Sequence, residues 1–136
     1  MTTKELSQLY YLNGEIELCE RKLAELKQRR GLCAVELDDM PHGKGGVRSK
    51  VEELAAEIVD LEAIIHAKRI ECLHERSRLE RYLREIPDSI TRQIFELRFA
   101  ECMSWNDVAV HIGGDNNVES VKKRCYRYLK KSGEEN

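Results

Sequence analysis

The stretch Ile94–Leu129, IFELRFAECMSWNDVAVHIGGDNNVESVKKRCYRYL, decides how the chain is organised. It reads as a short helix, a turn, a second short helix, a glycine-containing turn and a strongly basic helix. Ser104 is a favoured N-cap residue, and Gly113 stands where a helix ends in a left-handed residue. Asn116 followed by Glu119 predicts the cap of the last helix. This order of elements predicts a three-helix domain of the helix-turn-helix type.

The last predicted helix concentrates positive charge in a chain whose formal net charge is only −2. Between residues 118 and 131 six bases stand against one acid, Glu119. An apolar stripe runs along the same helix and consists of Val118, Val121, Cys125, Tyr128 and Leu129. A helix with one buried face and a basic outer face can hold a phosphate backbone while the whole protein stays near neutral. We therefore expect it to bind double-stranded DNA.

The outer face of this helix supplies the predicted DNA contacts. The residues expected to reach base edges are Glu119, Ser120, Lys123, Tyr126 and Arg127, of which Lys123 and Arg127 are the best placed. The residues expected to hold phosphates are Lys122, Arg124, Lys130 and Lys131. Trp105 is expected to pack at the edge of the domain core rather than to stack on a base.

Two long heptad patterns precede this domain. The first helix, expected from about residue 3 to 36, carries Leu9, Leu12, Ile16, Cys19, Leu23 and Leu26 at spacings of three and four. Ser49 is expected to cap a second long helix, which ends at Ile86-Pro87 because a residue before proline avoids the α region. The fold class that follows is all-α, a long antiparallel helical hairpin of coiled-coil type and then the helix-turn-helix domain. The expected divisions are 1–86 with a loop at about 38–48, 87–131, and a flexible tail at 132–136.

The second long helix has more apolar residues than one seam needs. Val59, Ile64, Ile70, Leu73 and Leu83 fall off the heptad line. A second apolar stripe is typical of a helix with more than one partner. We expect a homodimer through the hairpin, with the C-terminal domain as the other possible neighbour. RNA polymerase is a further protein that the hairpin is expected to contact.

Several functions find no support in the residues. The five cysteines form no CxxC pair, and no histidine stands at metal-ligand spacing, so no metal or cofactor is expected. GKGG at 43–46 lacks the spacing of a phosphate-binding loop. No catalytic constellation is present, and we expect a protein that is not an enzyme. There is no signal-peptide pattern and no long apolar run, which predicts a cytoplasmic protein without a membrane segment.

The C-terminal third resembles region 4 of sigma factors. The residues that carry the resemblance are Leu97-Arg98-Phe99, Met103-Ser104-Trp105, Asp107-Val108-Ala109, Ile112-Gly113 and Val121–Arg127. The turn after Gly113 is longer than in those factors, so a −35 promoter specificity is not carried over. The whole layout, with its GG-x-N turn at Gly113–Asn116, is more similar to phage and prophage proteins of Firmicutes related to the ArpU/RinA-type late transcription regulators. The resemblance implies a phage-encoded transcription regulator.

Two other functions fit parts of the pattern. A DNA-packaging protein of the small-terminase kind also joins a helix-turn-helix to oligomerising helices, although usually in the reverse order. A coiled-coil adaptor could use the basic helix to meet an acidic protein. A steep loss of DNA affinity with salt would separate the DNA-binding hypotheses from the adaptor.

Overall fold

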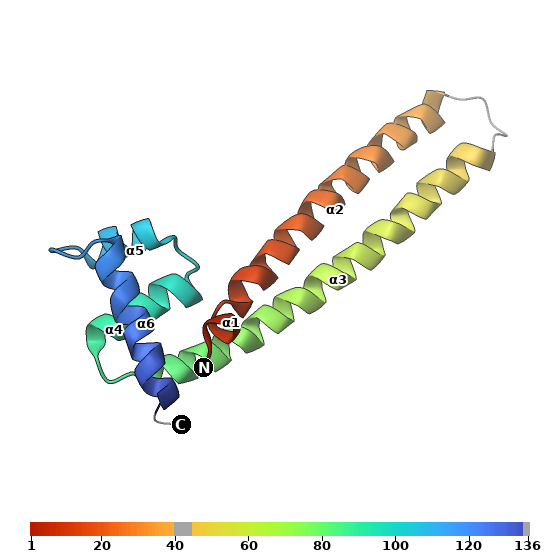
Figure 1. Cartoon of the computed structure of the whole chain (residues 1–136). Helices are drawn as coiled ribbons and strands as arrows, with labels where there is room; N and C mark the ends of the chain where they lie inside the picture. Colours follow the sequence, from red (N-terminus) through yellow and green to blue (C-terminus); the bar gives the residue numbers. More distant parts are fainter. Residues whose placement is uncertain (40–44, 135–136) are drawn as a thin grey trace. The chain divides into compact units, whose positions relative to one another are not determined.

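Every regular element in the described part of the chain is helical (Figure 1). The computed structural model describes the backbone of residues 1–39 and 45–134 and the side chains of residues 1–35 and 49–133. The elements are α1 (Thr3–Leu6), α2 (Gln8–Asp39), α3 (Gly45–Arg84), α4 (Ser89–Phe95), the π-helical turn η1 (Glu96–Ala100), α5 (Trp105–Ile112) and α6 (Val118–Glu134). The prediction of an all-α fold is confirmed. Across these residues no helix combines the length and the apolar character needed to cross a bilayer.

The helices form two compact units. Unit 1 contains Met1–Leu12 together with the described residues from Cys72 onward, and unit 2 contains the described residues of Asn13–Glu71. The sequence placed a boundary between residues 86 and 87. In the structure the unit that holds α4, α5 and α6 also includes the first twelve residues and the last part of α3.

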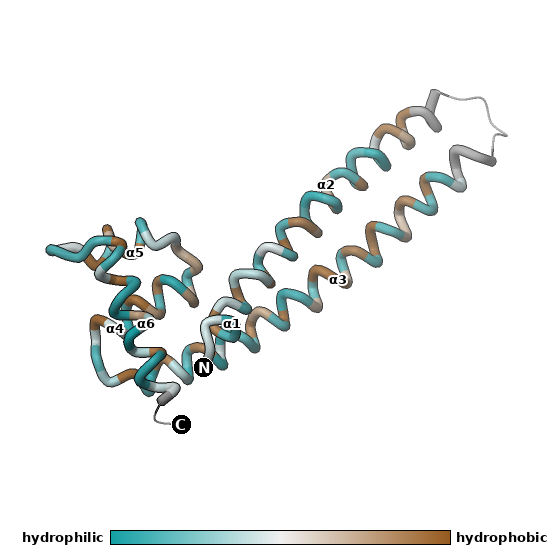
Figure 2. The backbone as a smooth tube through the Cα atoms, in the orientation of Figure 1, coloured by the Kyte–Doolittle hydropathy of each residue, from teal (hydrophilic) through white to brown (hydrophobic). Residues whose placement is uncertain are grey.

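Unit 2 consists of the facing parts of α2 and α3. Its buried apolar side chains are Ile16 and Leu26 on α2 and, at spacings of three and four residues, Ile58, Leu61 and Ile65 on α3. Figure 2 shows apolar positions alternating with polar ones along both helices. The ion pairs Lys68–Glu15 at 2.8 Å and Lys27–Glu62 at 3.6 Å join early positions of one helix to late positions of the other, so the helices run antiparallel. Exposed pairs of this kind contribute roughly 0–1 kcal/mol, so the apolar seam provides most of the stability.

The ends of the long helices differ from the prediction. The first predicted helix is interrupted at Ser7, which separates α1 from α2, and α2 then continues to Asp39. The expected cap at Ser49 is wrong, because α3 already begins at Gly45. Glycine costs about 1 kcal/mol relative to alanine inside a helix, which a helix of 40 residues can absorb. The part of the expected loop at residues 40–44 lies outside the described residues.

The core of unit 1 is built around Phe95, whose side chain is 0% exposed. Its ring centroid lies 5.4 Å from that of Phe99, 5.5 Å from that of Tyr128 and 6.4 Å from that of Tyr82. The core residues around them come from α1 to α6 and include Leu6, Leu9, Leu79, Leu83, Ile86, Ile94, Val108, Val121 and Cys125. The first residues of the chain therefore help to close the core that supports α6.

The short helix that precedes α5 is not one continuous α-helix. It begins at Ser89 after the N-cap Asp88, and at Glu96 it widens into η1, where the Glu101 amide donates to the Glu96 carbonyl at 2.9 Å. This wider turn places Phe99 and Ala100 in the core. Ile90, in the first turn of α4, is 39% exposed.

Gly113, at the C-terminal end of α5, is a position where substitution should lower stability. Gly113 has φ 70° and ψ −162°, a backbone conformation that is almost restricted to glycine. A Cβ at this position would meet only the Val110 carbonyl oxygen, at 3.9 Å. We expect Gly113→Ala to lower the stability of unit 1 by about 1–3 kcal/mol through backbone strain alone. Urea unfolding followed by the fluorescence of Trp105, the single tryptophan, measures the change.

Gly133→Ala is the matched control for that variant. Gly133 lies in α6 with open space at the Cβ position. Its replacement should leave stability unchanged or raise it slightly, because alanine is the better helix former. Equal losses in both variants would show that backbone strain at Gly113 is not the cause.

Candidate nucleic-acid interface

The turn between α5 and α6 is fixed by local hydrogen bonds. Ser104 caps α5 as predicted, and its Oγ accepts from the Asp107 amide at 3.2 Å. Gly113 and Gly114 both have positive φ, 70° and 64°, a backbone conformation that favours glycine and ends α5 in a turn. The Asn116 side-chain amide then donates to the Gly113 carbonyl at 3.1 Å. Asn116 therefore closes the turn.

The residue that caps α6 is Asn117, not Asn116 as the sequence pattern predicted. Asn117 Oδ1 accepts from the Ser120 amide at 2.8 Å, and the Asn117 amide donates to Ser120 Oγ at 2.9 Å. Ser120 Oγ also donates to the Asn117 carbonyl at 2.9 Å. The pair forms a reciprocal cap of two donors, and the Ser120 hydroxyl is occupied by this role.

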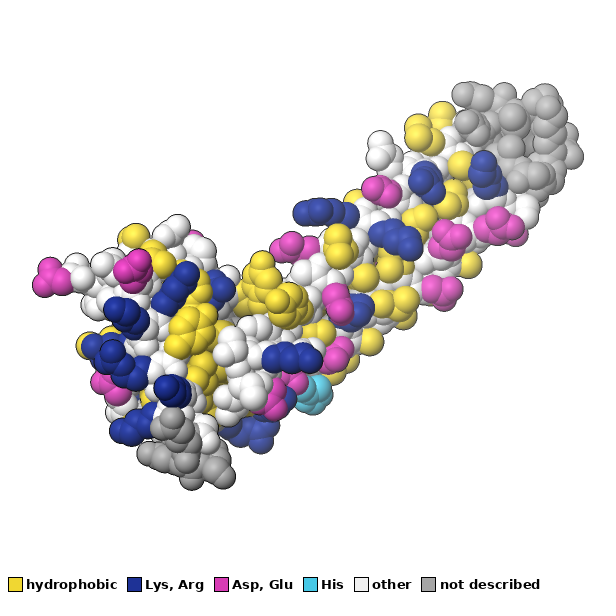
Figure 3. Space-filling view, viewed as in Figure 1, with side chains coloured by type: hydrophobic (Ala, Val, Ile, Leu, Met, Phe, Trp, Pro, Cys, Tyr) yellow, Lys and Arg dark blue, Asp and Glu magenta, His cyan; other side chains and the backbone are white. Residues whose placement is uncertain are grey.

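The packed face of α6 lies opposite its basic face. Val121 and Cys125 are 0% exposed and belong to the unit 1 core. Burial raises the pKa of the Cys125 thiol to about 12, so the thiol remains protonated and behaves as a small apolar side chain. Lys123, Arg124 and Arg127 are exposed. Figure 3 shows the Lys and Arg side chains gathered over this part of unit 1.

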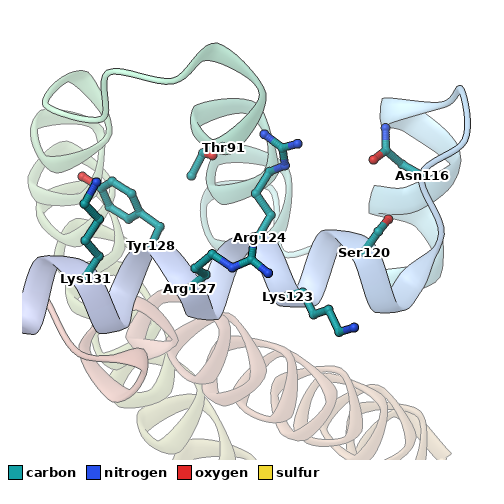
Figure 4. A pocket seen from close by; sticks show the side chains of 8 residues that line it. All are labelled: Thr91, Asn116, Ser120, Lys123, Arg124, Arg127, Tyr128 and Lys131. Atoms are coloured by element: carbon teal, nitrogen blue, oxygen red, sulfur yellow. The ribbon is translucent and has the colours of Figure 1, made fainter.

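Four cationic residues of α6 line one groove of about 440 Å³. They are Lys123, Arg124, Arg127 and Lys131, and the remaining lining residues are Thr91, Asn116, Ser120 and Tyr128. Figure 4 shows the groove between α6, the turn before it and α4. The cationic side chains share one side of the helix because their spacing follows the helical repeat. The groove is therefore a concave surface of positive charge.

Asp88 places one negative charge beside this groove. Its Oδ2 accepts from the Thr91 hydroxyl at 2.6 Å and from the Thr91 amide at 3.2 Å, which caps α4. The same oxygen accepts from Arg124 Nη1 at 3.1 Å. The Thr91 hydroxyl, the Thr91 amide and then Arg124 lower the pKa of Asp88, so the carboxylate stays ionised at neutral pH. Asp88 thus holds Arg124 toward α4.

The remaining predicted contacts lie outside the groove. Tyr126 is 47% exposed, and its ring packs against Trp105 at 6.1 Å between centroids. The Arg98 guanidinium lies 4.8 Å from the Trp105 ring centroid and donates to the Met103 carbonyl at 2.8 Å. The half-buried Trp105 packs against the core, as expected. Glu119, Lys122 and Lys130 do not line the groove.

Sequence reasoning missed the residues that other elements bring to the groove. Thr91 and Asp88 come from the start of α4, and only the fold places them beside α6. Tyr128 was assigned to the core stripe, yet it both lines the groove and packs on Phe95. Among the described residues, no group of three or more His, Cys, Asp or Glu side chains is arranged to hold a metal ion.

Comparisons with known proteins identify no relative. No protein-family model matches the chain, and neither a curated protein nor a solved structure matches it.

Proposed function

We propose that the protein is a sequence-specific binder of double-stranded DNA that regulates transcription in the cytoplasm and has no enzymatic activity. One observation carries the proposal. Lys123, Arg124, Arg127 and Lys131 converge on one groove, on a helix that a capped turn joins to α5. In helix-turn-helix proteins a second helix in this position enters the major groove of DNA.

The positions of the side chains along α6 favour different roles in base contact, phosphate contact and helix capping. Lys123 and Arg127 are exposed on its outer face and are proposed to reach base edges, where guanine offers two acceptors to a cationic side chain. Arg124 and Lys131 lie with them in the groove and are proposed to bind phosphates, which set the position of the helix. We assign Ser120 to capping, because its hydroxyl already holds hydrogen bonds to Asn117.

The other predicted contact residues are proposed to bind DNA outside the groove. Lys122 and Lys130 are proposed to meet phosphates beyond the groove, and Tyr126 to lie against the sugar-phosphate backbone beside Trp105. Glu119 is exposed at the start of α6, where a carboxylate can accept from a cytosine amino group. The resemblance to phage late regulators makes a promoter the proposed kind of target site.

The Asp88→Asn variant tests how the negative charge beside the groove affects DNA affinity. Asparagine caps a helix about as well as aspartate, so α4 should keep its start while the groove loses its neighbouring negative charge. We expect DNA affinity to rise by roughly 2–5-fold at low salt, because Arg124 no longer pairs with a carboxylate. Fluorescence anisotropy with a labelled duplex measures the change.

The control for that variant is Asp107→Asn. Asp107 is the exposed residue whose amide donates to the α5 cap, and it does not line the groove. The two variants have the same net charge. An equal gain in affinity from both would mean that overall charge, and not the groove, controls binding.

Genomic footprinting of a tagged copy tests the proposed function. We expect protected sites at promoters that share a sequence. Protection confined to a single packaging site would favour a DNA-packaging role instead. The absence of any protected site would overturn the proposal of a DNA-binding regulator.

A further inference from the structure

The outer side of α3 in unit 2 carries a second heptad stripe. It consists of Val59, Ala63, His66 and Ile70, at spacings of four, three and four residues. All four are exposed, Val59 at 64% and Ile70 at 43%. At 3.6 residues per turn the stripe lies about 140° around the helix from the buried seam that faces α2. The stripe is therefore directed away from α2.

We propose that this stripe binds the same stripe of a second copy of the chain, as an antiparallel pair of α3 helices related by a two-fold axis. The axis passes between Ile64 and Ile65. In this register Val59 packs against the partner's Ile70, and Ala63 packs against the partner's His66. Each pair occurs twice because the interface is isologous. The large side chains meet at the two ends, and the small Ala63 makes room for an imidazole near the axis.

Charge complementarity selects the antiparallel register. Glu62 and Arg69 lie on the same edge of the stripe, one heptad apart, and both are exposed. The antiparallel register places Glu62 beside the partner's Arg69, and the symmetry repeats the pair. On the other edge Asp60 falls beside the partner's Ala67, so that no like charges meet. In a parallel register Glu62 would instead face an alanine, and two His66 side chains would share a layer.

The ion pairs that Glu62 and Arg69 form within their own chain leave both side chains accessible to the partner. Glu62 pairs with Lys27 at 3.6 Å, and Arg69 pairs with Glu20. The Glu62 and Arg69 side chains keep exposed fractions of 50% and 61%, and a guanidinium offers several donors. Arg69 can therefore contact Glu20 of its own chain and Glu62 of the partner together.

The proposed dimer interface contains none of the proposed DNA-contact residues, so it is tested without DNA. A short stripe gives a small interface, so we expect a reversible dimer with Kd on the order of 100 µM or tighter. Sedimentation equilibrium of the full chain between roughly 5 and 500 µM measures it. A monomer throughout that range would overturn the proposal and favour a different protein as the binding partner of the stripe.

Charge introduced into the stripe should abolish the dimer. Val59→Glu combined with Ile70→Glu should weaken association at least about tenfold while circular dichroism stays unchanged, since both side chains are exposed. Leu18→Glu combined with Leu32→Glu is the matched control, because these residues of α2 are 64% and 62% exposed and lie off the stripe. Equal loss in both double variants would contradict the assigned surface.

Cross-linking tests the register directly. Separately purified Ala63→Cys and His66→Cys variants are mixed under mild oxidation, and the cross-linked peptides are mapped by mass spectrometry. The antiparallel register predicts a disulfide that joins the two different variants. Bonds that join two copies of the same variant at position 63 would show a parallel pair and overturn the proposal.

Discussion

Reversal of charge at Lys123 and Arg127 is expected to reduce specific DNA affinity by about 100-fold or more. Each cationic contact to a base edge contributes roughly 1–3 kcal/mol, and the Lys123→Glu, Arg127→Glu double variant also adds repulsion from phosphates. Both side chains are exposed, so the fold of unit 1 should remain intact. Anisotropy titration with a duplex selected from a random pool gives the affinity, and thermal unfolding followed by circular dichroism checks the fold.

Arg29→Glu combined with Arg30→Glu is the control for the same change in net charge. These residues are exposed on α2 in unit 2. We expect less than about a threefold change in affinity, because neither residue lines the groove or belongs to α6. If the control lost as much affinity as the groove variant, binding would depend on net charge and not on α6.

Phe95→Ala is expected to cause the largest loss of stability in unit 1. The residue is fully buried and contacts the rings of Tyr82, Phe99 and Tyr128. Truncating a buried phenylalanine costs about 3–5 kcal/mol, a large part of the roughly 5–15 kcal/mol that stabilises a typical domain. We expect unit 1 to unfold at a much lower urea concentration, as reported by Trp105 fluorescence.

Ile90→Ala is the comparison on the same helix. Ile90 is apolar but 39% exposed, so its truncation should cost less than about 1 kcal/mol. DNA binding should fall with the folded fraction in Phe95→Ala and stay near the native level in Ile90→Ala. A small effect of Phe95→Ala would mean that the aromatic cluster does not hold α4 and α6 together.

The sequence predicted best those features that neighbouring residues determine. Ser104 and Gly113 delimit α5 as predicted. Caps and left-handed ends are set by side chains within three or four residues, so they can be recognised in a single chain. The heptad spacing likewise identified buried residues such as Ile16 and Leu26.

Features that depend on distant residues were missed. Leu6 and Leu9 join the core beneath α4 to α6, although nothing near them in the sequence signals this. Asp88 caps α4 through neighbouring residues, but its pair with Arg124 requires α4 and α6 to lie side by side. The start of α6 was misplaced by one residue because adjacent asparagines, Asn116 and Asn117, are both good caps.

The salt dependence of DNA binding shows whether the cationic side chains of α6 bind the phosphate backbone. If the four proposed phosphate contacts replace condensed counterions, log K should fall with log salt concentration at a slope of about −3 to −4. These contacts are Lys122, Arg124, Lys130 and Lys131. Anisotropy titrations of the native protein between roughly 50 and 300 mM salt, with a selected duplex, provide that slope. The account predicts tight binding at low salt and this steep decline. No binding at 50 mM salt, or an affinity that does not change with salt, would contradict it.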